Sequence, residues 1–126
     1  MNNSFGNFLI IKRQIKQLSI REFARQINIS PEYISKIEKN ERTAPSKDIL
    51  IRISEVLMLN EPDKELLFDL AAMSKSPPAL AFDLIDFIME HPIIHKTLRL
   101  SKRENVSDDE WMKFASHIKQ NIKKEI

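Results

Sequence analysis

The chain has 126 residues and no cysteine, with one glycine, six prolines and a formal net charge of +2 at pH 7. This length fits one domain, or a small domain with an appendage, and the lack of cysteine excludes disulfide scaffolds, thiolate zinc sites and thiol nucleophiles. A single glycine disfavours hairpin-rich β folds, which depend on glycine turns, so we expect an all-α protein.

The first two predicted helices lie close to the start of the sequence. Apolar residues within one arc of a helical wheel predict a helix over residues 5–17. Ser19, followed by Glu22 three positions later, is a capping-box pattern. We therefore expect a short second helix directly after Ser19, and its apolar face consists of Ile20, Phe23, Ala24 and Ile27.

A third helix is predicted over residues 30–38. Asn28 tolerates the left-handed conformation that ends a helix, and Ser30 with Pro31 supplies an N-cap followed by a first-turn proline. The two isoleucines of this helix form its buried side. The side chains expected to point largely outward are Glu32, Tyr33, Ser35, Lys36 and Lys39.

Two more helices complete a five-helix region. Ser46 is expected to cap the fourth helix and Asn60 to begin the fifth. Two consecutive prolines make residues 74–78 the predicted linker. We therefore expect a domain over residues 1–73 and a helical segment over residues 79–126. The inward-facing residues of the fifth helix are predicted to be Leu66, Leu67, Leu70 and Ala71.

The segment after the linker is predicted to consist of amphipathic helical pieces. One piece ends at His91-Pro92, a shorter one covers residues 93–100, and Ser107 with Glu110 forms a second capping box. Its apolar stripes are expected to cover either the first five helices or a second subunit, and we favour dimerisation. The residues expected at the dimer interface are Phe87, Ile88, Trp111, Phe114 and Ile118.

The residues around the second and third helices fit a helix-turn-helix, which requires small or apolar residues inside the corner and polar ones on the exposed helix. The sequence reads LSIREFA over residues 18–24, ISPEYISKIE over residues 29–38 and NER over residues 40–42, followed by Pro45. This combined motif resembles the phage-repressor-like, xenobiotic-response-element family of helix-turn-helix regulators. The resemblance covers roughly residues 5–72 and says little about the chain beyond them.

The resemblance implies a five-helix, lambda-repressor-like DNA-binding domain followed by a C-terminal helical extension. It also implies a sequence-specific regulator that reads the major groove of double-stranded DNA with residues 30–38. Lys36 can donate to guanine O6 and N7, and Glu32 can accept from cytosine N4. The residues that the family pattern places at the bases are Glu32, Tyr33 and Lys36, with Ser30, Pro31 and Ser35 beside them.

Three cations in and after the loop that follows the third helix, Lys39, Arg42 and Lys47, are placed for contacts to DNA phosphates. Residues 1–60 carry ten Lys or Arg against six Asp or Glu, a net charge of +4, whereas residues 61–126 carry ten against twelve, a net charge of −2. The basic half is therefore the expected phosphate-facing surface.

The family pattern also implies a partly buried ion pair between Arg13 and Glu38, which would join the first helix to the end of the third. Both residues are therefore expected to be structural. The sequence departs from the family at two positions. Ile20 stands where a glutamine often contacts phosphate, and Asn40 stands where glycine is frequent; asparagine also tolerates a positive φ.

These observations favour a homodimeric repressor on a pseudo-palindromic operator, from a bacterium, phage or mobile element as the family implies. The alternative is an antitoxin or partner-controlled regulator whose C-terminal segment binds another protein. An enzyme is not expected, because the sequence has no phosphate-cradling glycine loop and no serine in a nucleophile-elbow context.

No cofactor and no metal site are expected. His91 and His95 have the spacing of a metal pair, but Pro92 intervenes and no third ligand cluster is evident. The start of the sequence lacks the features of a signal peptide, and no segment approaches the roughly 18 apolar residues that a membrane span requires. The expected location is the cytoplasm.

Overall fold

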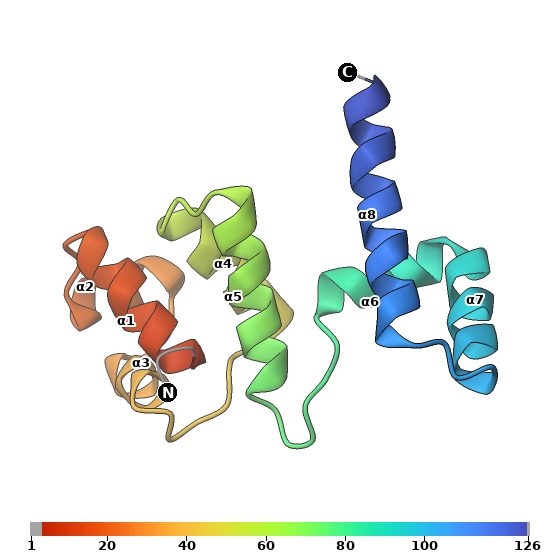
Figure 1. The fold of residues 1–126 in the computed structure, drawn as a ribbon. Coiled ribbons are helices and arrows are strands. Elements are labelled where there is room, and N and C mark those ends of the chain that lie inside the picture. Colours follow the sequence, from red (N-terminus) through yellow and green to blue (C-terminus); the bar gives the residue numbers. More distant parts are fainter. Residues whose placement is uncertain (1–3, 126) are drawn as a thin grey trace. The chain divides into compact units, whose positions relative to one another are not determined.

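The computed structural model describes the chain from residue 4 to residue 125, and its side chains from residue 4 to residue 121. Within that range the chain forms eight α-helices and no strand (Figure 1), which confirms the all-α prediction. The helices are α1 (Phe5–Ile15), α2 (Ile20–Ile27), α3 (Pro31–Glu38), α4 (Lys47–Val56), α5 (Glu61–Met73), α6 (Phe82–Glu90), α7 (Pro92–Arg103) and α8 (Asp108–Glu125).

The chain divides into two compact units, one up to Asp86 and one from Phe87 onward. The first unit extends past the predicted linker into the start of α6. Ala81 is buried with the core of this unit, and the ring of Phe82 lies 4.5 Å, centroid to centroid, from the ring of Phe68 in α5. Helix α6 therefore begins on the first unit and ends in the second.

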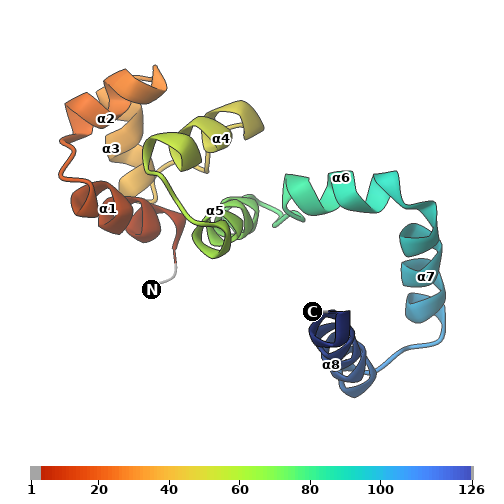
Figure 2. The ribbon, with the colours of Figure 1, turned by 90° about the horizontal axis from the view of Figure 1, so that it is seen from above.

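The core of the first unit lies among α1 to α5, which form one cluster in Figure 2. Helix α3 packs against α1 and α2, α4 packs against α2, and α5 packs against α1 and α4. Fully buried apolar side chains fill the space between them. The largest are Leu9, Phe23, Ile27, Ile34, Ile37, Ile53, Leu57 and Leu67.

Short polar side chains begin most of these helices, because they satisfy backbone N–H groups that have no partner inside the helix. The hydroxyl of Ser19 accepts from the backbone N–H of Glu22, and the amide oxygen of Asn60 accepts from that of Asp63. Ser46 begins α4 but makes no such side-chain bond. The caps at Ser19, Ser30 and Asn60 explain why α2, α3 and α5 begin where the sequence predicts.

One expected helix face and one expected helix end are wrong. Leu66 was expected to face inward but is 45% exposed, and Phe68 is buried in its place. Three consecutive apolar residues fit more than one helical face, so periodicity alone does not select the inner one. Helix α1 ends at Ile15, two residues before the predicted end, because Gln17 adopts a positive φ of 57°.

The second unit contains the end of α6 with α7 and α8, and none of its described side chains, over residues 87–121, is buried. Every closely packed pair of helices in the described part of the chain lies within α1 to α5. Ser107 caps α8 by accepting from the backbone N–H of Glu110 at 3.3 Å. Among the described residues, no helix is both long and apolar enough to cross a membrane.

Candidate nucleic-acid interface

The turn between α2 and α3 is built from contacts between residues close in sequence. Asn28 ends α2 in the left-handed conformation, with φ 61° and ψ 48°, and the N–H of Ile29 donates to the carbonyl of Ala24 at 3.0 Å. Ser30 begins α3, where its hydroxyl accepts from the N–H of Tyr33 at 3.2 Å. Because Ala24 is small and buried, the two helices approach closely and leave the opposite side of α3 free of them.

The outer side of α3 presents polar groups of different chemistry. Glu32 and Lys36 are exposed, whereas Ser35 is half-buried. Tyr33 was expected to point largely outward, but it is half-buried and packs against the core. The first two turns of α3 thus present a carboxylate and an ammonium group to solvent. The side chain of Tyr33 packs with one side against the core.

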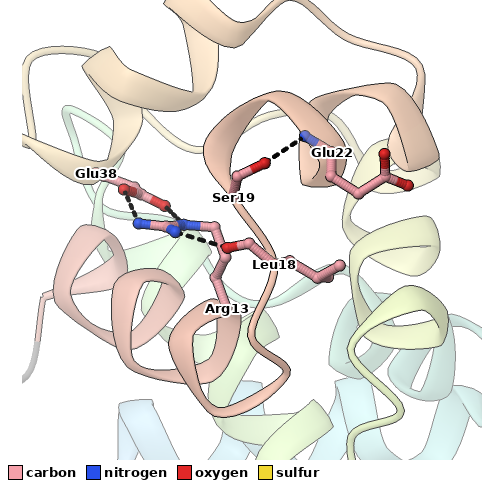
Figure 3. Close-up of polar contacts among 5 residues, drawn as sticks. All are labelled: Arg13, Leu18, Ser19, Glu22 and Glu38. Carbon is pink, nitrogen blue, oxygen red and sulfur yellow. Dashed lines mark hydrogen bonds and ion pairs between the residues drawn. The ribbon is translucent and has the colours of Figure 1, made fainter.

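An ion pair between Arg13 and Glu38 fastens the end of α3 to α1 (Figure 3). Arg13 Nε lies 2.7 Å from Glu38 Oε2, and its second guanidinium contact, to Oε1, is 3.1 Å. A third guanidinium nitrogen donates to the carbonyl of Leu18 at 2.8 Å. The two side chains are only 12% and 6% exposed. This bidentate geometry fixes α3 against both α1 and the loop before α2.

A second contact at the same end of α3 involves Gly6, which was not predicted. A Cβ at this position would lie 2.6 Å from the carbonyl oxygens of both Ile37 and Glu38. The N–H of Gly6 donates to Asn40 Oδ1 at 3.3 Å, and Asn40 itself adopts a φ of 61°. The glycine therefore lets the start of α1 touch the end of α3, a role that its position inside a helical pattern signals.

The three predicted phosphate-binding cations have different surroundings. Lys39 and Arg42 are exposed at and after the end of α3. Lys47, at the first position of α4, has its Nζ 3.4 Å from Asp86 Oδ2 and 5.3 Å from the centroid of the Phe82 ring. The start of α6 thus lies over one of the cations, and a DNA phosphate would have to compete with Asp86 for it.

A further cation, not predicted from the sequence, is Arg21 in the first turn of α2. Its side chain is exposed and borders a shallow hollow. This hollow is lined by residues from the start of α2 and from the start of α3. Its neighbour Ile20 is the position where the expected glutamine donor is missing. The other residues around the hollow are Ser19, Glu22, Arg25, Ile29 and Pro31.

The capping box predicted at α2 forms only in part. The N–H of Glu22 bonds to Ser19, but the Glu22 carboxylate turns away (Figure 3) and accepts from Arg25 and Gln26. These two bonds, that from Arg25 being the stronger influence, lower the pKa of Glu22 from 4.5 to about 2. The same pair raises the pKa of Arg25. Arg25 is thereby engaged, which leaves Arg21 as the cation of this hollow available to a phosphate.

The five predicted interface residues lie on α6 and α8. Phe87, Phe114 and Ile118 are exposed, and Ile88 and Trp111 are half-buried. The rings of Trp111 and Phe114 form an edge-on pair with centroids 6.2 Å apart. Within the described residues, no group of three or more His, Asp or Glu side chains is arranged to hold a metal ion.

A comparison with protein-family models matches residues 9–63 to a helix-turn-helix family. The matched range begins in α1 and ends at the start of α5, and it includes the whole α2–α3 corner with both partners of the Arg13–Glu38 pair. No curated protein and no solved structure matches the chain.

Proposed function

We propose, from the premise that residues 9–63 are a Cro/C1-type helix-turn-helix domain of the xenobiotic-response-element family, that the protein is a homodimeric repressor on a pseudo-palindromic operator. A domain of this family makes the protein a DNA-binding transcriptional regulator, and such regulators are typically not enzymes. The observation that carries the proposal is the polar outer side of α3, held by the buried Arg13–Glu38 pair.

Base reading is assigned to the exposed residues of α3. Lys36 donates to guanine O6 and N7, and Glu32 accepts from cytosine N4. Tyr33, being packed against the core, has a fixed ring that can present its edge to a thymine methyl group or its hydroxyl to a phosphate. Ser30, Pro31 and Ser35 lie beside these readers.

Phosphate contacts are assigned to Lys39, Arg42 and Lys47, to which we add Arg21. These cations lie at the start of α2, at the end of α3, in the following loop and at the start of α4. Cations flanking the reading helix fix its register on the duplex without carrying sequence information. Ile20 cannot donate a hydrogen bond to a phosphate, and the guanidinium group of the adjacent Arg21 supplies such a donor.

Dimerisation is assigned to the segment after the linker. Helices shorter than about 12–15 residues are marginal in water without tertiary packing, yet α7 has 12 residues and the described side chains of the second unit are not buried. A second copy that covers Phe87, Ile88, Trp111, Phe114 and Ile118 would supply the missing burial. It would also place two reading helices on half-sites about 34 Å apart.

A different protein could cover the same faces, as in the partner-controlled alternative. The two cases differ in the free protein, since a chain that serves a different partner has no need to pair with itself. Sedimentation equilibrium of the purified protein separates them. A dimer at micromolar concentration supports the homodimer. A monomer that forms a complex only with a second gene product of its operon would contradict the homodimer and support the partner-controlled alternative.

The regulator itself is tested by titrating the purified protein with the DNA upstream of its own gene and with random duplex, at several salt concentrations. We expect one site to bind about 10³-fold or more tightly than random DNA, which is the range of specific regulators. Equal and salt-sensitive binding to both DNAs would contradict sequence-specific reading.

A further inference from the structure

The corner between α6 and α7 contains a small hollow of about 250 Å³ in the second unit. Its lining is mainly apolar, and its residues come only from the end of α6 and the first half of α7. A hollow of this size accepts one or two side chains and is too small for the ligand pockets of about 300–1,000 Å³ that are usual in proteins. The lining residues are Ile88, Met89, Pro92, His95 and Lys96.

Helix α8 carries an aromatic pair, Trp111 and Phe114, whose side chains could fill such a hollow. Phe114 is 53% exposed, and Trp111 and Phe114 contact one another edge to edge. Neither residue lines the hollow of its own chain, and α7 and α8 are not among the closely packed helix pairs of the described chain. Phe114 is therefore largely open to solvent, Trp111 is half-buried, and no residue of α8 lines the hollow.

The charges on the two elements are complementary. Helix α7 carries four cations, Lys96, Arg99, Lys102 and Arg103, and no acidic residue. The first turn of α8, directly before the aromatic pair, carries three acidic residues, Asp108, Asp109 and Glu110. A basic helix and an acidic helix start on the same chain make the segment self-complementary, which is the requirement of a two-fold symmetric interface.

We propose that the occupant of the α6–α7 hollow is the Trp111–Phe114 pair of a second copy of this chain. The acidic start of α8 lies along the basic α7 of the partner, and the contact occurs twice in the dimer. This inference rests on the proposed homodimer and specifies how its two copies recognise one another. Opposite charges steer the pairing, and burial of the aromatic pair supplies its stability.

The test reverses the charges on each element separately. One variant carries Lys96→Glu and Arg99→Glu, and the other carries Asp108→Lys and Asp109→Lys. Each variant alone brings like charges together at both contacts, so we expect its dimer dissociation constant to rise at least about tenfold. A one-to-one mixture restores wild-type affinity, because each contact then pairs opposite charges between copies. The control for the first variant, Lys16→Glu with Lys75→Glu, makes the same change in net charge on exposed sites of the first unit.

Sedimentation with one variant fluorescently labelled reads out these equilibria. A chain that carries all four substitutions pairs opposite charges both within itself and between copies. If this chain dimerises like the wild type while the one-to-one mixture of the two variants does not, α7 and α8 contact one another within one chain, and the inference is wrong. If the wild type is dimeric and neither variant weakens it, the copies pair elsewhere, and the homodimer stands without this contact. If the wild type is a monomer, the homodimer and the inference both fail.

A cross-link gives a readout that does not depend on charge. The chain has no cysteine, so Met89→Cys on one chain and Phe114→Cys on another introduce the only thiols. Under mild oxidation, we expect the mixture to form a covalent heterodimer faster than either variant forms a homodimer. Equal rates of cross-linking in the mixture and in the separate variants would contradict the placement of α8 in the hollow.

Discussion

The two units differ in what their helices bury. Helix α4, with 10 residues, buries Leu50, Ile53 and Ser54, whereas α7, with 12 residues, has no buried residue. The first unit thus stabilises its helices within one chain. In the second unit, α7 and α8 expose most of their described apolar side chains, which the proposed second copy would cover.

This difference separates two roles. The first unit holds α3 in place through apolar packing, the Arg13–Glu38 pair and the Gly6 contact, so the helix proposed to read DNA is positioned by the protein itself. The second unit carries the features of an association surface, with exposed aromatic residues and segments of opposite charge. We therefore expect substitutions in the first unit to change the free energy of unfolding by the same amount at every protein concentration. Substitutions in the second unit should change dimerisation, so their effect should depend on protein concentration.

The largest effect is expected for Arg13→Ala. The substitution leaves the carboxylate of Glu38 buried without its partner, which typically costs about 3–5 kcal/mol. Denaturant unfolding followed by circular dichroism measures this loss. The double variant Arg13→Met with Glu38→Leu should regain most of it, because no buried charge then remains. A loss below about 1 kcal/mol for Arg13→Ala would show that the pair does not fix α3.

A comparable but more context-dependent effect is expected for Leu67→Ala, about 2–5 kcal/mol, because the side chain is fully buried. The contrasting variant is Phe114→Ala. At concentrations where the protein is monomeric, it should change stability by less than about 0.5 kcal/mol, as exposed substitutions usually do. Thermal unfolding at two protein concentrations a hundredfold apart checks both. A large, concentration-independent loss for Phe114→Ala would erase the distinction between the units.

Lys36→Ala should cost about 1–3 kcal/mol of binding to the specific site and relax the preference at one base pair. Arg42→Ala should instead weaken binding to all sequences alike and lower the salt slope by about one unit per site. Fluorescence anisotropy with operator variants and random duplex separates the two patterns. Equal losses on specific and random DNA for Lys36→Ala would contradict its assignment to base reading.

A smaller effect is expected for Asp86→Asn, which removes the carboxylate beside Lys47. Exposed ion pairs are worth up to about 1 kcal/mol, so DNA affinity should rise measurably, by up to about fivefold, on specific and random DNA equally. The control Asp69→Asn removes an exposed carboxylate from α5. Unchanged affinity for Asp86→Asn, or an equal gain for the control, would mean that Asp86 does not compete with a phosphate for Lys47.

The smallest effect concerns pH. Since the pKa of Glu22 falls from 4.5 to about 2 in the folded protein, its contribution to stability is fully present above pH 4.5 and is lost as the pH falls towards 2. The difference in unfolding temperature between wild type and Glu22→Gln should be constant from pH 7 to pH 5 and shrink below that range. A difference that disappears already between pH 7 and pH 5 would contradict the Glu22–Arg25 pairing.

Local patterns in the sequence predict much of the first unit. Ser19 and Ser30 cap helices because their hydroxyls reach backbone N–H groups only three residues away, a contact that spacing alone reveals. The Arg13–Glu38 pair was expected only from the resemblance to a known family, since nothing in the spacing of these two residues implies contact.

Contacts between distant residues could not be predicted in the same way. Lys47 and Asp86 are 39 residues apart and meet only because Phe82 packs on Phe68 and thereby docks the start of α6. The close approach of Gly6 to α3 depends likewise on how two helices cross. Leu66 and Phe68 exchange roles because neighbouring apolar residues leave the orientation of α5 to tertiary packing.

The most direct test of the division between the units compares the full chain with residues 1–86 on an operator containing two half-sites. We expect residues 1–86 to unfold at the same denaturant concentration as the first unit of the full chain, to sediment as a monomer, and to bind the operator at least about 100-fold more weakly, since paired half-site binding is lost. If residues 1–86 bind as tightly as the full chain, with two copies per operator, the second unit is not the dimerisation element and the account is contradicted.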